Sequence, residues 1–228
     1  MIIKKIHIFL LKIYVNVLRL SNVVLLYQPT YMTNKFRIIK NNNIRESDKR
    51  IDLIISSVGE MSGSYLDVGS QLGYFVFKMS EKGFFSMGIE SERYAYSYSN
   101  SLKVINENEN VVFMNKSIDN DNIKDIPSFD VVSIMNVFHH LVYFLGFDNA
   151  DIVMRELYNK TNKILFFETG EYEEKGEYWS DCLSFMGEDS SVWIHSYLLK
   201  IGFSDVKKIG ESSTHLNPHK RTLYLCCK

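Results

Sequence analysis

The amino-acid sequence predicts an α/β fold: a three-layer sandwich in which helices cover both faces of a mostly parallel, seven-stranded sheet. From residue 65 onwards, short apolar segments alternate with amphipathic helical segments, the order typical of parallel strands joined by crossover helices. The last two apolar segments are joined by a short polar loop, which predicts a C-terminal antiparallel hairpin. With 228 residues, 46% of them hydrophobic, the chain is long enough to bury a sizeable core.

Hydrophobic periodicity places the individual elements along the chain. Strands are expected over residues 65–68, 85–89, 111–114, 129–135, 163–167, 206–209 and 222–226. Helices are expected over residues 74–81, 94–106, 150–159 and 190–200, and a further helix starts at Ser47. We therefore expect the α/β domain to comprise residues 47–228, preceded over residues 1–46 by an N-terminal amphipathic helix and a polar lid or linker.

The N-terminal segment is apolar but does not have the pattern of a membrane span or a signal peptide. Lys12 and Arg19 interrupt it, and no small-residue cleavage site follows. Apolar side chains recur at helical spacing, at Ile6, Phe9, Leu10, Ile13, Val17, Leu20 and Val24. This pattern favours an amphipathic helix packed on the domain or on a partner chain, and it leaves open a helix peripheral to the inner face of a membrane.

Composition argues against several classes of function. A net charge of −1 provides no electrostatic reason to expect nucleic acid or an anionic membrane as a partner. The three cysteines, Cys182, Cys226 and Cys227, form neither a disulfide framework nor a CxxC metal motif. We therefore expect the protein to lie in a reducing, cytoplasmic compartment. The composition does not decide whether the chain forms an oligomer.

A turn with two glycines, followed by a spaced acid, is the strongest functional signal. Asp67 ends a predicted strand, and Gly69 and Gly73 follow where the next helix opens. Open α/β sheets bind ligands at this edge, and glycine lets the backbone approach a ligand closely. Glu90 ends the next predicted strand, 23 residues after Asp67, where its carboxylate can accept hydrogen bonds from both ribose hydroxyls. This layout predicts a nucleoside-containing ligand.

The glycine spacing distinguishes two kinds of ligand. Dinucleotide folds use GxGxxG, in which the middle glycine admits a pyrophosphate, whereas here three residues separate Gly69 from Gly73. S-adenosylmethionine has no phosphate, and its ammonium favours an acid before the glycines. We predict S-adenosylmethionine as the cofactor; a purely structural turn is the alternative. The predicted cofactor-binding residues are Asp67, Gly69, Ser70, Gly73, Phe75, Glu90, Ser117, Ile118, Asp119 and Asn136, with Ile118 packing on adenine and Asp119 accepting from its amino group.

Two adjacent histidines follow the fourth predicted strand, which begins at Asp130 and ends at Asn136. His139 and His140 then lie beside the expected methyl group, and we predict both as catalytic; one structural and one exposed histidine is the alternative. No Asn-Pro-Pro-Tyr type of motif is present, which disfavours methylation of a nucleic-acid base nitrogen. Neighbouring side chains point in different directions and no acidic or cysteine partner has ligand spacing, so we predict no metal site.

These motifs together resemble class I S-adenosylmethionine-dependent methyltransferases, which have a Rossmann-like fold. Within that group the chain is most similar to the methyltransferase domain of the bacterial O-antigen chain-terminating methyltransferase–kinases. The resemblance rests on Lys49–Ile54, Leu66–Phe75, Gly88–Glu90, Asn136–His140 and Thr214–Pro218, followed by Leu223–Leu225. It implies O-methylation of a terminal phosphate or a sugar hydroxyl on a surface polysaccharide, which would make the substrate a glycan precursor of capsule or polysaccharide biosynthesis.

The residues needed depend on the methyl acceptor. A sugar hydroxyl must lose its proton, for which a histidine is a suitable general base, whereas a phosphate monoester is already largely a dianion near pH 7 and needs cationic groups around it. The predicted substrate-binding residues are Arg45, Arg50, Glu168, Tyr178, Trp179, His215, Lys220 and Arg221, with a core position for Trp179 as the alternative. Other small metabolites, a wobble-modified tRNA, or the role of an inactive cofactor-binding partner subunit remain alternative functions.

Overall fold

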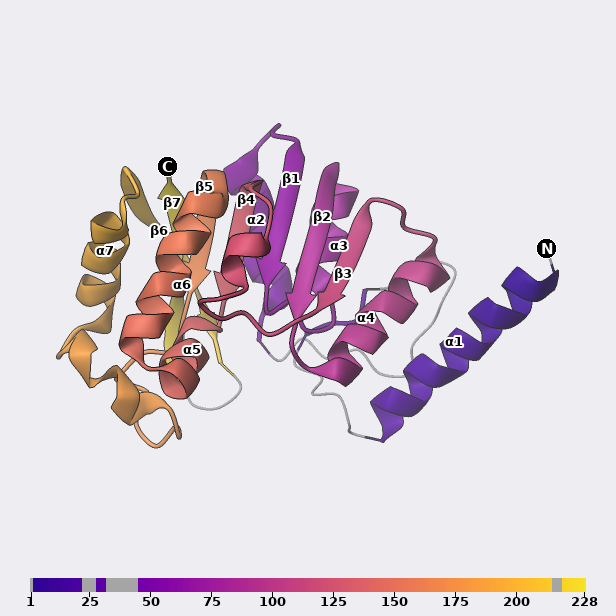
Figure 1. Cartoon of the computed structure of the whole chain (residues 1–228), viewed down its shortest axis with the longest axis horizontal. Helices are drawn as coiled ribbons and strands as arrows, with labels where there is room; N and C mark the ends of the chain where they lie inside the picture. The colour runs from indigo at the N-terminus through magenta and orange to yellow at the C-terminus, as the bar shows by residue number, and fades with distance from the viewer. Residues whose placement is uncertain (1, 22–27, 32–44, 215–218) are drawn as a thin grey trace.

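The computed structural model describes residues 2–21, 28–31, 45–214 and 219–228, and Figure 1 shows their arrangement. The strands are β1 (Gly63–Val68), β2 (Phe84–Glu90), β3 (Val111–Asn115), β4 (Phe129–Met135), β5 (Thr161–Glu168), β6 (Asp205–Ser213) and β7 (Lys220–Cys227). The helices are α1 (Ile2–Leu20), α2 (Ser47–Val58), α3 (Tyr74–Glu81), α4 (Arg93–Asn106), α5 (Phe138–Leu145), α6 (Phe147–Lys160) and α7 (Ser190–Ile201), with 3-10 turns at Ile123–Asp125 and Ser180–Met186.

The seven strands form one sheet in the order β3-β2-β1-β4-β5-β7-β6. Strands β1 to β5 run parallel to their neighbours, and β7 is antiparallel to both β5 and β6. The predicted α/β fold class is therefore confirmed, including the C-terminal antiparallel hairpin. The order reverses between β1 and β4, which opens a crevice at the carboxyl ends of these two strands.

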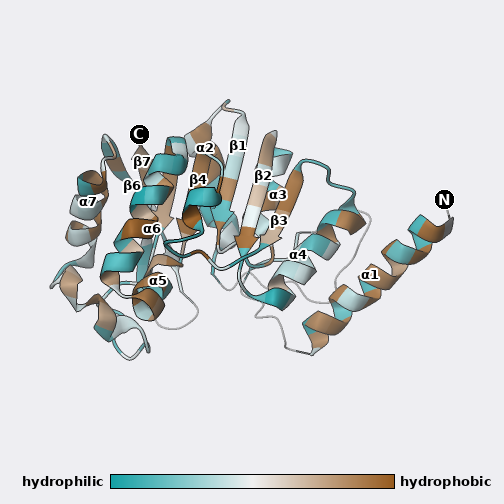
Figure 2. Cartoon of the chain, in the orientation of Figure 1, coloured by the Kyte–Doolittle hydropathy of each residue, from teal (hydrophilic) through white to brown (hydrophobic). Residues whose placement is uncertain are grey.

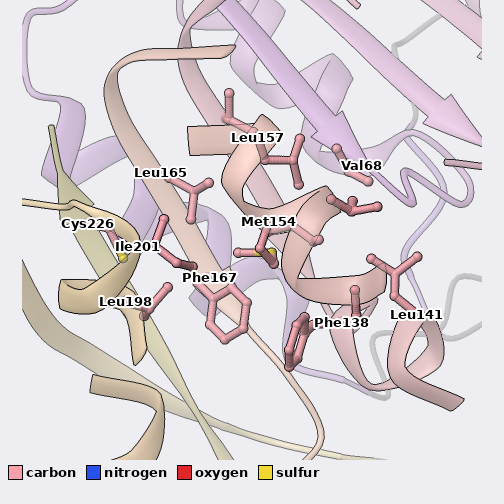
Figure 3. Packing of buried hydrophobic residues seen from close by; sticks show 14 of the residues in the cluster. Val68, Phe138, Leu141, Met154, Leu157, Leu165, Phe167, Leu198, Ile201 and Cys226 are labelled. Atoms are coloured by element: carbon pink, nitrogen blue, oxygen red, sulfur yellow. The ribbon is translucent and has the colours of Figure 1, made fainter. Parts of the chain in front are cut away.

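Alternation along the central strands explains the two helical layers. In β1, Tyr65 faces one apolar cluster, whereas Leu66 and Val68 face the other. Helices α2, α3 and α4 cover the first face and α5, α6 and α7 the second (Figure 1). In the second layer, Phe138 of α5 and Phe167 of β5 pack edge to face, with ring centroids 5.7 Å apart (Figure 3).

Helix α5 is the main element that the sequence analysis did not predict. Its eight residues follow β4 after a two-residue turn, and no side chain caps its first turn. Helices this short lack a clear periodic signal, and burial of Phe138, Leu141 and Val142 holds this one in place. The structure therefore places His139 and His140 in a helix that starts directly after the carboxyl end of β4.

The N-terminal segment forms α1, but the face that packs on the domain differs from the apolar series named above. Val15 and Leu18 are buried, and Ile8 and Leu11 pack beside them, so α1 lies against α4. The named series, from Ile6 to Leu20, points to solvent, and Val24 is outside the described residues. Within the described part of the chain, no helix is long and apolar enough to cross a membrane.

Candidate active site

A cavity of about 860 Å³ opens at the carboxyl edge of β1, β2 and β4. The predicted site residues that line it are Arg45, Arg50, Asp67, Gly69, Phe75, Glu90, Ser117, Ile118, Asn136, His140 and Tyr178. Predicted residues outside the lining are Ser70, Gly73, Asp119, His139, Glu168, Trp179, Lys220 and Arg221, and His215 is outside the described residues. The cavity therefore brings together predicted residues that lie up to 133 positions apart in the sequence.

The glycine turn allows the loops after β1 and β4 to approach each other closely. Gly69 has a left-handed backbone, with φ at +76°, and its amide donates to the carbonyl of Ile89 at 2.8 Å. A β-carbon at this position would lie 2.4 Å from Cγ2 of Val137, in the turn after β4. Gly69 thus lets the loops after β1 and β4 meet at the cavity wall. Ser70 and Gly73 belong to the same turn, but they do not line the cavity.

The carboxyl group of Asp67 is buried, and one of its oxygens accepts no hydrogen bond in the described part of the chain. The hydroxyl of Ser133 donates to Oδ1 at 2.6 Å, whereas Oδ2 is buried and has no hydrogen-bond partner in the described part of the chain. Burial raises the pKa of this carboxyl to about 7. A buried acceptor without a donor is costly, and Asp67 lines the cavity, so the ammonium of S-adenosylmethionine fits this position.

Glu90 is fixed at the end of β2 by two backbone amides. Gln71 donates to Oε2 at 2.8 Å and Glu92 donates to Oε1 at 2.7 Å. Burial raises the pKa of Glu90, although these hydrogen bonds act in the opposite direction. Each carboxylate oxygen retains a further lone pair, so Glu90 is suited to hold the ribose hydroxyls of the cofactor.

At the adenine end, Ser117 and Ile118 line the cavity but Asp119 does not. The Asp119 carboxylate accepts from the amides of Asp121 and Asn122, both at 3.0 Å, and so caps its own turn. The predicted contact between this carboxylate and the adenine amino group thus has no support in the geometry. Two residues of α4 that were not predicted, Tyr94 and Ala95, also line the cavity.

Two predicted substrate residues form a buried ion pair. The Arg50 guanidinium donates to both oxygens of Glu168, with Nε–Oε2 and Nη2–Oε1 distances of 2.8 Å, and both side chains are almost fully buried. Arg50 still contributes to the cavity wall, but Glu168 balances its charge. The pair joins the start of α2 to the end of β5 beside the acceptor region.

Arg221 is a buried positioning residue in this structure. It donates to Glu174 through Nε at 2.7 Å and Nη2 at 2.9 Å, and through Nη1 to Oδ1 of Asn136 at 2.5 Å. Its guanidinium also lies 5.3 Å from the centre of the buried Trp179 ring. Asn136 has a left-handed backbone with φ at +60°, so Arg221 holds a strained residue at the cavity wall.

The two predicted catalytic histidines have different environments. His139 is buried, its Nδ1 accepts from the amide of Gly170 at 2.9 Å, and its ring packs 4.4 Å from Trp179. Burial, with Arg221 nearby, lowers its pKa well below the ordinary value. The neutral ring therefore carries its proton on Nε2, and His139 lies behind the cavity wall rather than in it. A structural role accounts for these contacts.

His140 lines the cavity and is paired with Tyr178. Its Nδ1 lies 3.0 Å from the Tyr178 hydroxyl. Burial, and then the charges of Arg221 and Arg45, lower its pKa to about 4, so the imidazole is neutral at physiological pH. A neutral imidazole in the cavity can accept a proton, which makes His140 the candidate general base. The sequence analysis missed Leu141, Phe144 and Leu145, whose helical spacing on α5 places them in the same wall.

Among the described residues, no group of three or more His, Cys, Asp or Glu side chains is arranged to hold a metal ion.

Known proteins share this fold, and two curated relatives with the same description share sequence. No family model matches the chain. The chain is 25% identical over 189 residues to the O-antigen chain terminator bifunctional methyltransferase/kinase WbdD of Escherichia coli, covering 79% of this chain and 25% of that protein. The chain thus spans about a quarter of the relative's length.

Solved structures agree on the fold. A crystal structure of WbdD superposes with a TM-score of 0.75 at 23% identity, covering 93% of this chain and 46% of that chain. The magnesium protoporphyrin IX methyltransferase ChlM of Synechocystis PCC 6803, solved with bound S-adenosylmethionine, superposes with a TM-score of 0.63 at 13% identity, covering 97% of both chains. The similarity in sequence and the common fold confirm the predicted resemblance to class I methyltransferases, and the geometry of the cavity supports the predicted methyltransferase activity with S-adenosylmethionine as the cofactor.

Proposed function

We propose that this chain methylates an oxygen atom of a phosphorylated sugar or surface-polysaccharide precursor. The observation that best supports this is the acceptor end of the cavity, where Arg45 and Arg50 line the same space as the neutral imidazole of His140. The sequence relative, whose name refers to the O-antigen chain, points to the same class of acceptor.

S-adenosylmethionine supplies a methyl group activated by its sulfonium. The chain's own residues bind the cofactor, orient the acceptor and take up a proton. When Nδ1 of His140 carries the proton and donates to Tyr178, Nε2 is left to accept the proton of a sugar hydroxyl. The hydrogen bond also fixes the plane of the imidazole ring.

A phosphate on the acceptor needs a cation in the same cavity. Arg45 lines the cavity, and its positive charge contributes to the lowered pKa of His140. Lys220 is exposed outside the lining. Its place in the cavity wall and its positive charge beside His140 support Arg45 as the residue that recognises the phosphate, with a neighbouring hydroxyl as the methylated group.

Incubation with methyl-labelled S-adenosylmethionine tests this proposal directly. The acceptor panel contains nucleotide-activated sugars and phosphorylated glycans, their dephosphorylated counterparts, small metabolites and tRNA. We expect label on phosphorylated carbohydrates only, and we expect it to stay on the sugar after phosphatase treatment. If the label is found in a phosphatase-resistant methyl phosphate, the methylated atom is a phosphate oxygen and not a sugar hydroxyl. Label on tRNA or on an uncharged metabolite alone rejects the proposed acceptor class.

A further inference from the structure

Helix α1 presents an apolar stripe to solvent along its whole length. Its members follow the alternating three- and four-residue spacing of one helix face, and 47% to 83% of each side chain's surface is exposed. The residues are Ile3, Ile6, Leu10, Ile13, Val17 and Leu20. Figure 2 shows hydrophobic residues repeating along α1. A contiguous apolar stripe of this kind marks an interaction surface.

The stripe is held in a fixed orientation because the opposite face of α1 is docked on the domain. The Tyr14 hydroxyl lies 2.9 Å from Oγ of Ser97 on α4, and Arg19 donates to Thr30 at 2.6 Å. Val15 is fully buried in the contact with α4. Helix α1 lies at the end of the molecule, beyond α4 (Figure 1). The side chains of its apolar stripe are exposed to solvent.

The charge of the chain is divided unevenly around this helix. Residues 1–45 carry eight of the 26 Lys and Arg residues and none of the 27 Asp and Glu residues, so residues 46–228 hold 18 basic and 27 acidic side chains. The overall net charge of −1 conceals this division. Charge asymmetry of this kind suggests an anionic partner. On α1 itself, Lys4 pairs with Glu107 and Arg19 is buried, so Lys5 and Lys12 are the basic side chains that matter for an anionic surface. Lys5 and Lys12, seven residues apart, lie on one flank of the stripe.

We propose that α1 docks this chain on an anionic phospholipid bilayer, with the helix lying in the plane of the membrane. The apolar stripe then enters the boundary between headgroups and acyl chains, and Lys5 and Lys12 on its flank lie at the level of the anionic headgroups. A second copy of this chain is disfavoured as the occupant because it would bring two acid-free basic segments together.

Vesicle flotation with the full chain tests the proposal. The vesicles contain either phosphatidylcholine alone or phosphatidylcholine with about 30% phosphatidylglycerol. We expect at least tenfold stronger binding to the anionic vesicles at 0.1 M salt and a marked loss at 0.5 M salt, because the attraction between charges is screened. The triple variant Ile6→Ser, Leu10→Ser, Ile13→Ser should lose at least tenfold in binding, since each substitution removes an exposed apolar side chain.

A matched control keeps the test specific. The variant Ile152→Ser, Val192→Ser, Leu199→Ser removes three apolar side chains of comparable exposure from α6 and α7, and it should float like the wild type. Both variants should retain the wild-type thermal shift with S-adenosylmethionine, which shows that the domain is folded. Equal binding to both vesicle types, no binding at all, or a wild-type dimer that the α1 variant converts to a monomer would each overturn the proposal.

Discussion

At the scale of single residues, the cofactor site depends on a carboxyl whose protonation is poised near neutral pH. Asp67 is fully buried, accepts one hydrogen bond from Ser133 and has a pKa of about 7. An ammonium placed against Oδ2 favours the ionised form. Cofactor binding should therefore release the proton of Asp67, which links the affinity for S-adenosylmethionine to pH.

We expect the affinity for S-adenosylmethionine to fall as the pH decreases below about 7, by up to about tenfold per pH unit. The variant Asp67→Asn should bind at least tenfold more weakly at pH 8 and lose this pH dependence. Isothermal titration calorimetry between pH 5.5 and 8.5 measures both effects. An affinity that is independent of pH in the wild type would contradict this role for Asp67.

The same carboxyl should destabilise the cofactor-free domain at high pH. A carboxyl whose pKa is raised on folding causes no loss of stability below its unfolded value near 3.8; the loss then grows as the pH rises towards 7 and is complete above it. At about 1.4 kcal/mol per pKa unit, the loss at pH 8 is at most about 4 kcal/mol. Urea unfolding should therefore show Asp67→Asn to be more stable than the wild type at pH 8, and the difference should shrink towards pH 5.

The two adjacent histidines should respond differently to the same substitution. His140→Gln should lower kcat by roughly 10²–10⁴-fold for a hydroxyl acceptor and leave S-adenosylmethionine binding unchanged, because only the general base is lost. His139→Gln is the matched control: it removes the acceptor of the Gly170 amide and should mainly lower the Tm. Methyl-transfer kinetics and thermal denaturation separate the two. If His139→Gln alone abolishes turnover in a folded protein, His139 is the base instead.

At the scale of secondary-structure elements, the cavity depends on how closely the turns after β1 and β4 approach each other. Gly69→Ala places a methyl group 2.4 Å from Val137 and also strains a left-handed backbone. We expect at least tenfold weaker cofactor binding and a loss of about 1–3 kcal/mol in stability. Gly187→Ala is the control, because its φ of +74° is almost the same but its β-carbon meets no atom within 4 Å. Equal effects of the two variants on cofactor affinity would show that backbone strain alone is responsible.

Strand β7 also contributes to the site, although it lies beyond β5 in the sheet. Its Arg221 passes from β7 to Asn136 at the end of β4 and is neutralised by Glu174, which belongs to the segment after β5. The hairpin therefore supports the acceptor region through a buried hydrogen-bond network. Arginine is suited to this role because its planar guanidinium donates to several partners at once.

At the scale of the whole molecule, the cofactor should stabilise the fold, because the cavity joins turns from three neighbouring strands. At a concentration about 100 times the Kd, S-adenosylmethionine should add about 2.7 kcal/mol to the free energy of unfolding. Differential scanning fluorimetry should show the corresponding rise in Tm, with NAD at the same concentration as the control ligand. A rise with NAD and none with S-adenosylmethionine would reject the cofactor.

The sequence predicted the sheet well, and most of the predicted cofactor residues lie together in the lining of one cavity. The strands are short apolar segments and the crossover helices are periodic, so local hydrophobicity was sufficient to locate β1 to β7. The turn from Asp67 to Gly73 and the position of Glu90 are also local, because a ligand at the carboxyl edge contacts consecutive loops. The order of the strands and the existence of α5 were less accessible, since α5 is short and stabilised by packing.

The acceptor half was decided by tertiary structure. Arg50, Glu168 and Arg221 are all charged, and nothing in their sequence neighbourhoods indicates which of them are buried with a partner. His139 and His140 are adjacent, yet a helix directs one ring into the core and the other into the cavity. By itself, the sequence determined the fold class, the class of cofactor and the amphipathic character of α1, because each rests on a local pattern. Only the tertiary structure decided which charges are neutralised, which histidine lines the cavity and which face of α1 remains exposed, because these depend on contacts between segments far apart in the chain.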